Sequence, residues 1–221
     1  LGWGLVDTNT NPLVVGLYPK DKTHRLNVIH AWWPAGLVLG GLTGWALGRI
    51  DIRWEYQLLS TLVPAVLLFI LCCIAKFPLT ERAAAGISFG DMFKEIVRRP
   101  MFWVWFFCIW FTATAELAPG QWVDMALTRT IGMRGIWLVI YVSGLMFVMR
   151  HFAGTVVHKL SPVGLLWVSC LLASGGLLWL SFADGPVIAI LGATLWGVGV
   201  CYMWPTMLAT VNERYPRSGA L

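Results

Sequence analysis

The sequence predicts an all-α, polytopic membrane protein whose helices form a bundle. Of its 221 residues, 58% are hydrophobic and only 12% are charged, and its mean hydropathy is +0.71. These values exclude an ordinary soluble domain. Apolar windows of about 20 residues, the length that crosses a bilayer, recur along the chain. We expect membrane spans at 26–48, 54–75, 101–126, 136–157, 163–183 and 187–209.

Residues 1–18 form an apolar stretch that we expect to be the end of a further helix. The polar cluster from Asp7 to Asn11 stands close to the first residue, which is not Met, and no signal peptide is visible. A helix that carries this cluster at membrane depth needs more residues before it. We therefore expect the chain to be an internal part of a longer protein.

Basic residues are distributed unevenly over the expected loops. If the loop at 20–25 is cytoplasmic and the loops alternate, 12 Lys and Arg lie on the cytoplasmic side, a count that includes Arg150. Four lie on the other side. Because loops rich in Lys and Arg stay in the cytoplasm, we expect this orientation. The basic residues do not gather on one face, so we expect no nucleic-acid partner.

The longest expected loop divides the chain into three parts. We expect 1–75 to be the end of an N-terminal bundle, 76–100 a central cytoplasmic loop, and 101–221 a C-terminal bundle. Inside the loop, Ser88 and Asp91 have the spacing of a helix cap. The apolar residues that follow at helical spacing predict a short amphipathic helix on the inner membrane face. They are Phe89, Met92, Phe93, Ile96 and Val97.

Glycine recurs at every fourth residue of the 26–48 span, at Gly36, Gly40, Gly44 and Gly48. This spacing places all four near one face of a helix, where a partner backbone can approach closely. We expect a tightly packed neighbouring helix on this face.

The sequence lacks several motifs of soluble enzymes. It has no HExxH, no phosphate-binding loop and no dinucleotide fingerprint. Its four His and five Cys show no metal-ligand spacing. We therefore expect no enzymatic activity, no cofactor and no metal site. The ionisable residues at membrane depth remain as candidates for function.

Asp7 and Arg150 are the strongest candidates. Asp7 lies about 11 residues before its helix ends at Tyr18, near the midplane at about 1.5 Å per residue, and Asn11 follows one turn later. Arg150 lies about ten residues above the inner end of its helix, beyond easy snorkelling reach. We expect the two charges to pair. The alternatives are a structural or capping role for Asp7 and snorkelling for Arg150.

Glu116 and several tryptophans form a second group. Glu116 precedes the Pro119–Gly120 pair, which frees backbone groups to line a cavity, and we expect it toward the outer side of the membrane. Binding and gating roles stay open for it. We expect Asn27 and His30 at the membrane interface. Four tryptophans lie further inside, where they stack on a sugar or fill the core: Trp32, Trp33, Trp110 and Trp204.

Several of these stretches resemble the fucose permease group of the major facilitator superfamily. The acid-T-x-x-N-P pattern and the R-L-N that follows it resemble that group's fourth and fifth helices. MRHFAGTVVHKLSP looks like its eighth helix, with Arg150, Phe152 shifted by one residue, and Gly154 matching an R-F-x-G core. Three further stretches look like that group's helices seven and ten: RRP-x-F at 98–102, the Glu116 segment and the WP…ERYP tail. The fourth- and fifth-helix match comprises Asp7, Thr8, Asn11, Pro12, Arg25, Leu26 and Asn27.

The resemblance implies a chain running from late helix four to the start of helix eleven of a twelve-helix transporter. Two six-helix bundles would rock around a midplane site, with Asp7 and Arg150 in substrate recognition and a proton-coupling acid in helix one, outside this chain. The fucose transporter has Glu at the position of Asp7 and Asn at the position of Trp33. Glucose, galactose or another neutral monosaccharide is therefore expected at least as much as fucose.

We expect an inner-membrane secondary transporter, a monosaccharide:proton symporter that acts as a monomer. Its substrate-binding candidates are Asp7 and Arg150, followed by Asn11, Trp33 and Glu116. The nearest alternative is the same fold moving an organic anion or a drug. A membrane sensor or membrane enzyme without transport is the other.

Overall fold

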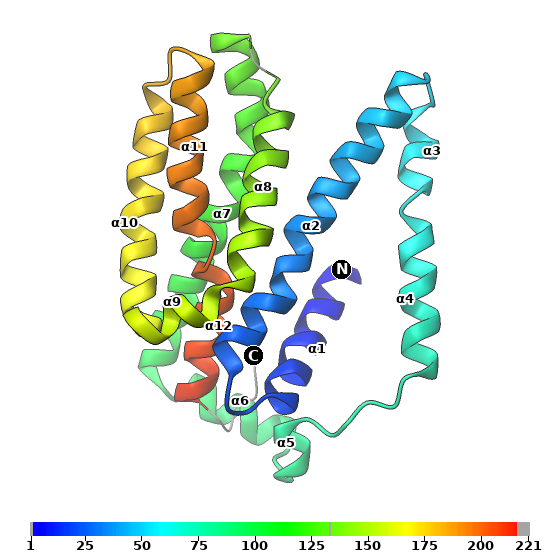
Figure 1. Ribbon diagram of the computed structural model, residues 1–221. Helices are drawn as coiled ribbons and strands as arrows, with labels where there is room; N and C mark the ends of the chain where they lie inside the picture. Colours follow the sequence, from blue (N-terminus) through cyan, green and yellow to red (C-terminus); the bar gives the residue numbers. More distant parts are fainter. Residues whose placement is uncertain (1, 133, 216–221) are drawn as a thin grey trace.

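The computed structural model describes residues 2–132 and 134–215, and within these ranges it contains twelve helices and no strand. The predicted all-α class is therefore confirmed (Figure 1). The expected start of a further helix after residue 215 lies outside the described residues. The helices are α1 Gly2–Leu17, α2 Lys22–Arg49, α3 Trp54–Leu59, α4 Leu62–Ile74, α5 Glu81–Ala84, α6 Phe89–Val97, α7 Pro100–Ile131, α8 Ile136–His151, α9 Ala153–Leu160, α10 Pro162–Ser181, α11 Pro186–Val200 and α12 Met203–Arg214.

Most of the predicted spans coincide with helices that are long and apolar enough to cross a membrane. The described chain has four such helices, or five if α8 and α9, which meet at 67°, form one broken span. The span predicted at 26–48 is a single helix of 28 residues, α2. It falls outside this set because its glycines, tryptophans and polar residues add little hydropathy. The four are Trp54–Ile74, Pro100–Arg129, Pro162–Ser181 and Pro186–Arg214.

Helices α2 and α8 run antiparallel and touch along most of their length. Trp45 meets Trp137 at one end, with ring centroids 6.0 Å apart. In the middle, Trp32 meets Phe147 at 5.7 Å. Toward the start of α2, the chain following α8 takes over, because the backbone N–H of Gly154 donates to the His24 ring at 3.2 Å. This long contact joins the part of the chain before the 76–100 segment to the part after it.

Among the described helices, α10 and α11 pack most closely, and glycine residues let their backbones approach. A Cβ atom at Gly176 would collide with the backbone of Trp196, and one at Gly199 with the backbone of Ala173. The predicted glycine stripe of α2 behaves otherwise. A Cβ at Gly36, Gly40 or Gly48 would meet no described atom within 4 Å.

The expectation of a close neighbour on the α2 stripe is therefore wrong for the described residues. The contact that α2 does make through glycine is at Gly41, one residue off the stripe, where a Cβ would lie 3.0 Å from the Ile140 side chain. Spacing placed the four glycines on one face correctly, but the orientation of that face follows from packing on α8.

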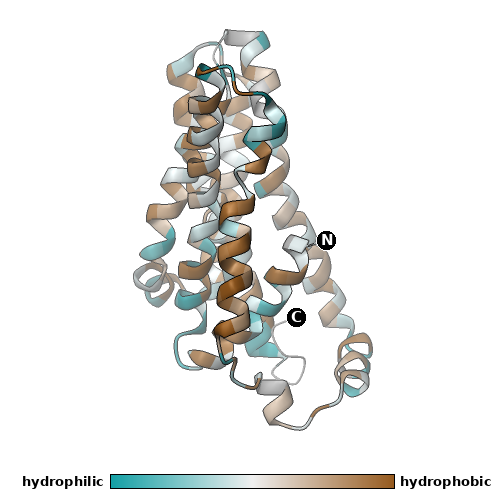
Figure 2. Ribbon diagram, turned by 90° about the vertical axis from the view of Figure 1, so that its right-hand side faces the viewer, coloured by the Kyte–Doolittle hydropathy of each residue, from teal (hydrophilic) through white to brown (hydrophobic). Residues whose placement is uncertain are grey.

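Helices α3 and α4 stand beside the other helices (Figure 1), and neither has a buried residue. The ribbon of α4 is coloured hydrophobic along nearly its whole length in Figure 2, and its exposed residues include Phe69, Leu71 and Ile74. An apolar helix without a buried face suits a hydrocarbon environment or the contact of another helix.

The amphipathic helix predicted within 76–100 is confirmed as α6. Ser88 is its N-cap and accepts a hydrogen bond from the Asp91 backbone N–H at 3.1 Å. Met92 and Ile96 are buried, whereas Phe93 stays exposed. The loops before α2 and after α9 lie at the same end of the molecule as α6 (Figure 1). This is the arrangement that alternating loops require.

Candidate functional site

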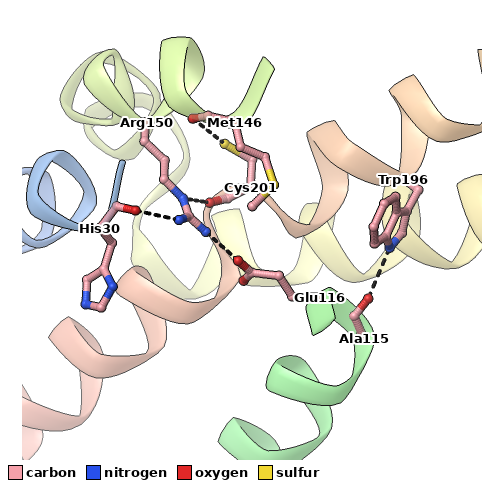
Figure 3. A network of polar contacts seen from close by, with 7 residues as sticks. All are labelled: His30, Ala115, Glu116, Met146, Arg150, Trp196 and Cys201. Carbon is pink, nitrogen blue, oxygen red and sulfur yellow. Dashed lines mark hydrogen bonds and ion pairs between the residues drawn. The ribbon is translucent and has the colours of Figure 1, made fainter. Parts of the chain in front are cut away.

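Arg150 is the centre of a buried polar network at the end of α8. Its side chain is 1% exposed and donates three hydrogen bonds in three directions (Figure 3). Nε donates to the main-chain oxygen of Cys201 at 2.7 Å, and Nη1 to that of His30 at 2.8 Å. Nη2 donates to Glu116 Oε1 at 2.8 Å. One guanidinium therefore ties α2, α7, α8 and the break between α11 and α12 together.

Prolines explain why the two main-chain oxygens are available to Arg150. In an α-helix, the carbonyl of residue i accepts from the N–H of residue i+4, and proline has no N–H. Pro34 lies four residues after His30, and Pro205 lies four residues after Cys201. Each proline leaves one carbonyl without its helical donor, and Arg150 supplies the missing hydrogen.

Pro119 does the same at a third place in the network. It lies four residues after Ala115, whose main-chain oxygen accepts from Trp196 Nε1 at 3.1 Å (Figure 3). The Pro119–Gly120 pair was predicted to free backbone groups at a cavity. The freed carbonyl binds Trp196 of α11 and so fixes α7 against α11.

The partner of Arg150 is Glu116, which corrects the expected pairing with Asp7. The two side chains form an ion pair of 2.8 Å and are 1% and 7% exposed. Glu116 was also expected nearer the outer surface. Helix α7 has 32 residues, about 48 Å at 1.5 Å per residue, and this exceeds the hydrocarbon thickness. Glu116 lies at the middle of α7 and therefore at the depth of Arg150.

One oxygen of the Glu116 carboxylate has no partner. Oε1 is paired with Arg150, but Oε2 is buried and accepts no hydrogen bond from the described residues. A buried acceptor without a donor is costly. Such a group is suited to accept a hydrogen bond from a ligand or a water.

A small central cavity of about 60 Å³ lies against this network. Four of the five predicted substrate-binding residues contribute to its wall: Asp7, Trp33, Glu116 and Arg150. His30 and Trp204 complete its polar and aromatic lining. Side chains from α1, α2, α7, α8 and α12 thus meet around one space.

Two larger cavities adjoin the central cavity through shared walls. The α1-side cavity, of about 300 Å³, shares Asp7 and Trp204 with it. The α8-side cavity, of about 120 Å³, shares Trp33, Glu116 and Leu117. The central cavity is the smallest of these three spaces and shares wall residues with both of the others.

Asn11, the fifth predicted residue, lines the α1-side cavity and reaches the central one through His30. Its Oδ1 lies 2.8 Å from His30 Nε2. Asp7 lies one helical turn before Asn11 and lines both the central and the α1-side cavity. The structure therefore links Asn11 of α1 to His30 of α2 by a hydrogen bond, beside Asp7.

A buried polar seam closes the interface of α2 with α9 and α12. We use this name for the contacts of Lys22, His24 and Asn27 with Asn212, Gly154 and Thr206. Lys22 Nζ donates to Asn212 Oδ1 at 3.0 Å, and Asn27 Nδ2 donates to Thr206 Oγ1 at 3.4 Å. The seam is not fully satisfied, because Asn27 Oδ1 and Asn212 Nδ2 are buried without partners.

Sequence reasoning missed His30 and Asn27, which were expected at the membrane interface. Asn27 is 0% exposed, and the His30 ring lines the central cavity. Trp32 and Trp110, by contrast, are exposed. The signal for His30 was present, since a proline four residues later marks a free carbonyl. Arg150 is buried at this site, so it does not belong to the loop charges and the expected cytoplasmic count becomes 11.

Comparison with known proteins places the chain in a family. A family model described as Major Facilitator Superfamily matches residues 1–220. Neither the curated proteins nor the solved structures give a significant match. Within the part of the chain that the structure describes, no group of three or more His, Cys, Asp and Glu could hold a metal ion. The chain belongs to the Major Facilitator Superfamily, a family of multi-pass membrane transporters.

Proposed function

We propose that the protein is a secondary transporter of a small neutral solute, a monosaccharide moved by proton symport. The observation that carries this proposal is the Glu116–Arg150 pair with its free carboxylate oxygen at the wall of the central cavity. The proposed site comprises Asp7, Asn11, Trp33, Glu116 and Arg150, with His30 and Trp204.

The charge of the central cavity favours a neutral solute over an anion. Arg150 was the reason to consider an organic anion, but its charge is matched by Glu116 at 2.8 Å. Asp7 then adds a second carboxylate to the same wall. Two carboxylates against one guanidinium repel an anion.

The remaining groups have the chemistry of a sugar site. Glu116 Oε2 and the Asp7 carboxylate are acceptors for hydroxyl groups. Trp33 and Trp204 offer aromatic faces, which pack on the C–H face of a pyranose. In the fucose permease group that the sequence resembles, the helix-four acid and the helix-eight Arg contribute to substrate recognition, and these match Asp7 and Arg150.

Asp7 supports the proton coupling. In the described part of the chain, no Lys, Arg or His forms an ion pair with it. A lone carboxylate at membrane depth is costly unless it gains a proton or a partner. We infer that a proton bound at this site travels with the solute, together with any coupling acid in helix one of the full-length protein.

The three adjoining cavities support alternating access. The α1–α4 and α7–α12 parts would rock about the α2–α8 contact, opening the α1-side and α8-side cavities in turn. We place the protein in the inner membrane as a monomer, with the 76–100 segment in the cytoplasm, on the loop charges.

The test is uptake by the full-length protein in proteoliposomes. Labelled glucose, galactose, fucose and xylose are supplied with and without an inward proton gradient. Gradient-dependent accumulation of one sugar is expected. Uptake that only equilibrates would contradict symport.

A lipophilic cation is the second candidate, because a cavity with excess negative charge and two tryptophans also suits such a drug. Labelled tetraphenylphosphonium belongs in the same panel. Movement of this cation, with no sugar transported, would replace the sugar proposal.

A further inference from the structure

We propose that His30 is a positioning residue of the transport site, joining Asn11 of α1 to Arg150 of α8 beside the central cavity. The inference rests on the proposed function, since it assigns a role within that same site. It starts from two bonds that leave one residue in different directions. The His30 ring binds Asn11, and the His30 main-chain oxygen binds Arg150.

The direction of the ring bond follows from the groups involved. Asn11 Oδ1 is an acceptor only, so at 2.8 Å the His30 Nε2 must carry the hydrogen. The bond therefore runs from His30 as donor to Asn11 as acceptor, and Asn11 lies with Asp7 in the wall of the α1-side cavity.

The donor at His30 Nε2 fixes the orientation of the Asn11 amide, because the amide oxygen must face it. Removing this donor frees the Asn11 amide to rotate, so Asn11 no longer presents a fixed group to the α1-side cavity.

The main-chain bond makes the same residue part of the Arg150 anchor. Pro34 leaves the His30 carbonyl without its helical donor, and Arg150 Nη1 occupies it at 2.8 Å. The backbone of His30 thus touches the Glu116–Arg150 pair, and its ring touches Asn11. A solute in the central cavity is framed by groups that His30 holds at a fixed separation.

Two variants separate the ring from the backbone. His30→Met removes the ring donor, whereas His30→Gln keeps an N–H near the position of Nε2; both retain the carbonyl. In proteoliposomes containing the full-length protein, we expect His30→Met to raise the KM for the accumulated sugar up to about tenfold, the size of one lost hydrogen bond. The maximal rate should stay within about twofold because uniform binding is lost.

Gln should restore the KM to within about threefold of the wild type, since it replaces the donor. The matched control is His151→Met. Its ring lies within hydrogen-bonding distance of the Phe147 carbonyl of its own helix and packs on the Phe147 ring, so the KM of this variant should not change. Adding Asn11→Ala to His30→Met should raise the KM no further than Asn11→Ala alone, because both variants remove the same hydrogen bond.

Three outcomes would overturn the proposal. An unchanged KM for His30→Met would remove the positioning role. Equal KM values for the Met and Gln variants would show that the N–H donor of the ring is not what matters for binding. A lower maximal rate with an unchanged KM would show a folding defect only.

A second readout does not depend on the solute. In ¹⁵N-histidine-labelled protein, solid-state NMR should show His30, assigned by its loss in His30→Gln, with hydrogen on Nε2. Asn11→Val should change this signal. An unchanged signal contradicts the His30–Asn11 hydrogen bond even where no sugar is transported. If the wild type accumulates no sugar but the expected NMR change is seen, only the sugar proposal is contradicted.

Discussion

Most of the described site depends on the side chain of Arg150. Its three hydrogen bonds are to one carboxylate and two main-chain oxygens. A guanidinium cannot lose its charge in a protein, so at membrane depth it must be surrounded by acceptors. Glu116 is the partner that neutralises it.

Replacement of Glu116 tests this balance. Glu116→Gln keeps the shape of the side chain but leaves Arg150 as an unpaired buried charge, and we expect the free energy of unfolding to fall by about 3–5 kcal/mol. Thermal unfolding in detergent measures the loss. The control is Glu55→Gln, because Glu55 pairs with Arg53 at an exposed site and should lose less than about 1 kcal/mol.

The double variant Glu116→Leu with Arg150→Met distinguishes stability from function. Apolar replacement removes both buried charges together, so the double variant should be more stable than Glu116→Gln, although the His30 and Cys201 carbonyls lose their donor. It should not accumulate the sugar. Retained transport would show that the pair serves packing and not binding.

At the scale of the helices, proline is the feature that organises the network. Pro34, Pro119 and Pro205 lie within α2, α7 and α12, and each frees a carbonyl that accepts from a side chain of another helix. Proline normally costs a helix about 3 kcal/mol. Here the released acceptors stabilise contacts between helices.

Pro34→Ala restores an N–H that competes with Arg150 for the His30 carbonyl. The regained helical bond should leave the unfolding temperature unchanged or higher, while the weakened Arg150 anchor should raise the KM for the sugar roughly threefold to tenfold. Proteoliposome uptake and thermal unfolding provide the two measurements. Pro64→Ala in the exposed helix α4 is the control. A fall in stability with an unchanged KM would contradict the account.

At the scale of the whole molecule, the α2 interface changes character along its length. Near Lys22 it is the polar seam, with two buried groups left without partners. Near Trp45 it is aromatic. Polar groups regain hydrogen bonds when water enters, whereas separated aromatic faces lose contact. The interface should therefore open at the polar seam and pivot at the aromatic end.

Thr206→Val tests this difference with an almost isosteric change. It removes the hydroxyl that accepts from Asn27, and we expect the seam to weaken by about 1 kcal/mol. Hydrogen exchange of peptides covering 22–27 and 203–212 should become about fivefold faster. Thr210→Val is the control, since that hydroxyl binds only within its own helix. Equal exchange in both variants would contradict a seam that opens.

The sequence allowed prediction of the spans, the helix at Phe89–Val97 and four residues that line one cavity. It did not allow prediction of which charges pair. A count of residues gives the height of a side chain along its helix, but not the direction in which the helix turns it. Packing sets that direction. Glu116, and not Asp7, is therefore the partner of Arg150, and the glycine stripe of α2 faces away from α8. The breaks at Phe152 and Cys201 divided two predicted spans for the same reason.

The proline-freed carbonyl at Cys201 also affects how this site can vary through mutation. Every amino acid carries a carbonyl, so the bond from Arg150 makes no demand on the chemistry of the side chain at position 201 beyond its size. The demand falls instead on Pro205, which contributes no atom to that bond. Inherited substitutions should therefore be tolerated at position 201, which makes the contact, and removed by selection at Pro205, which does not take part in it.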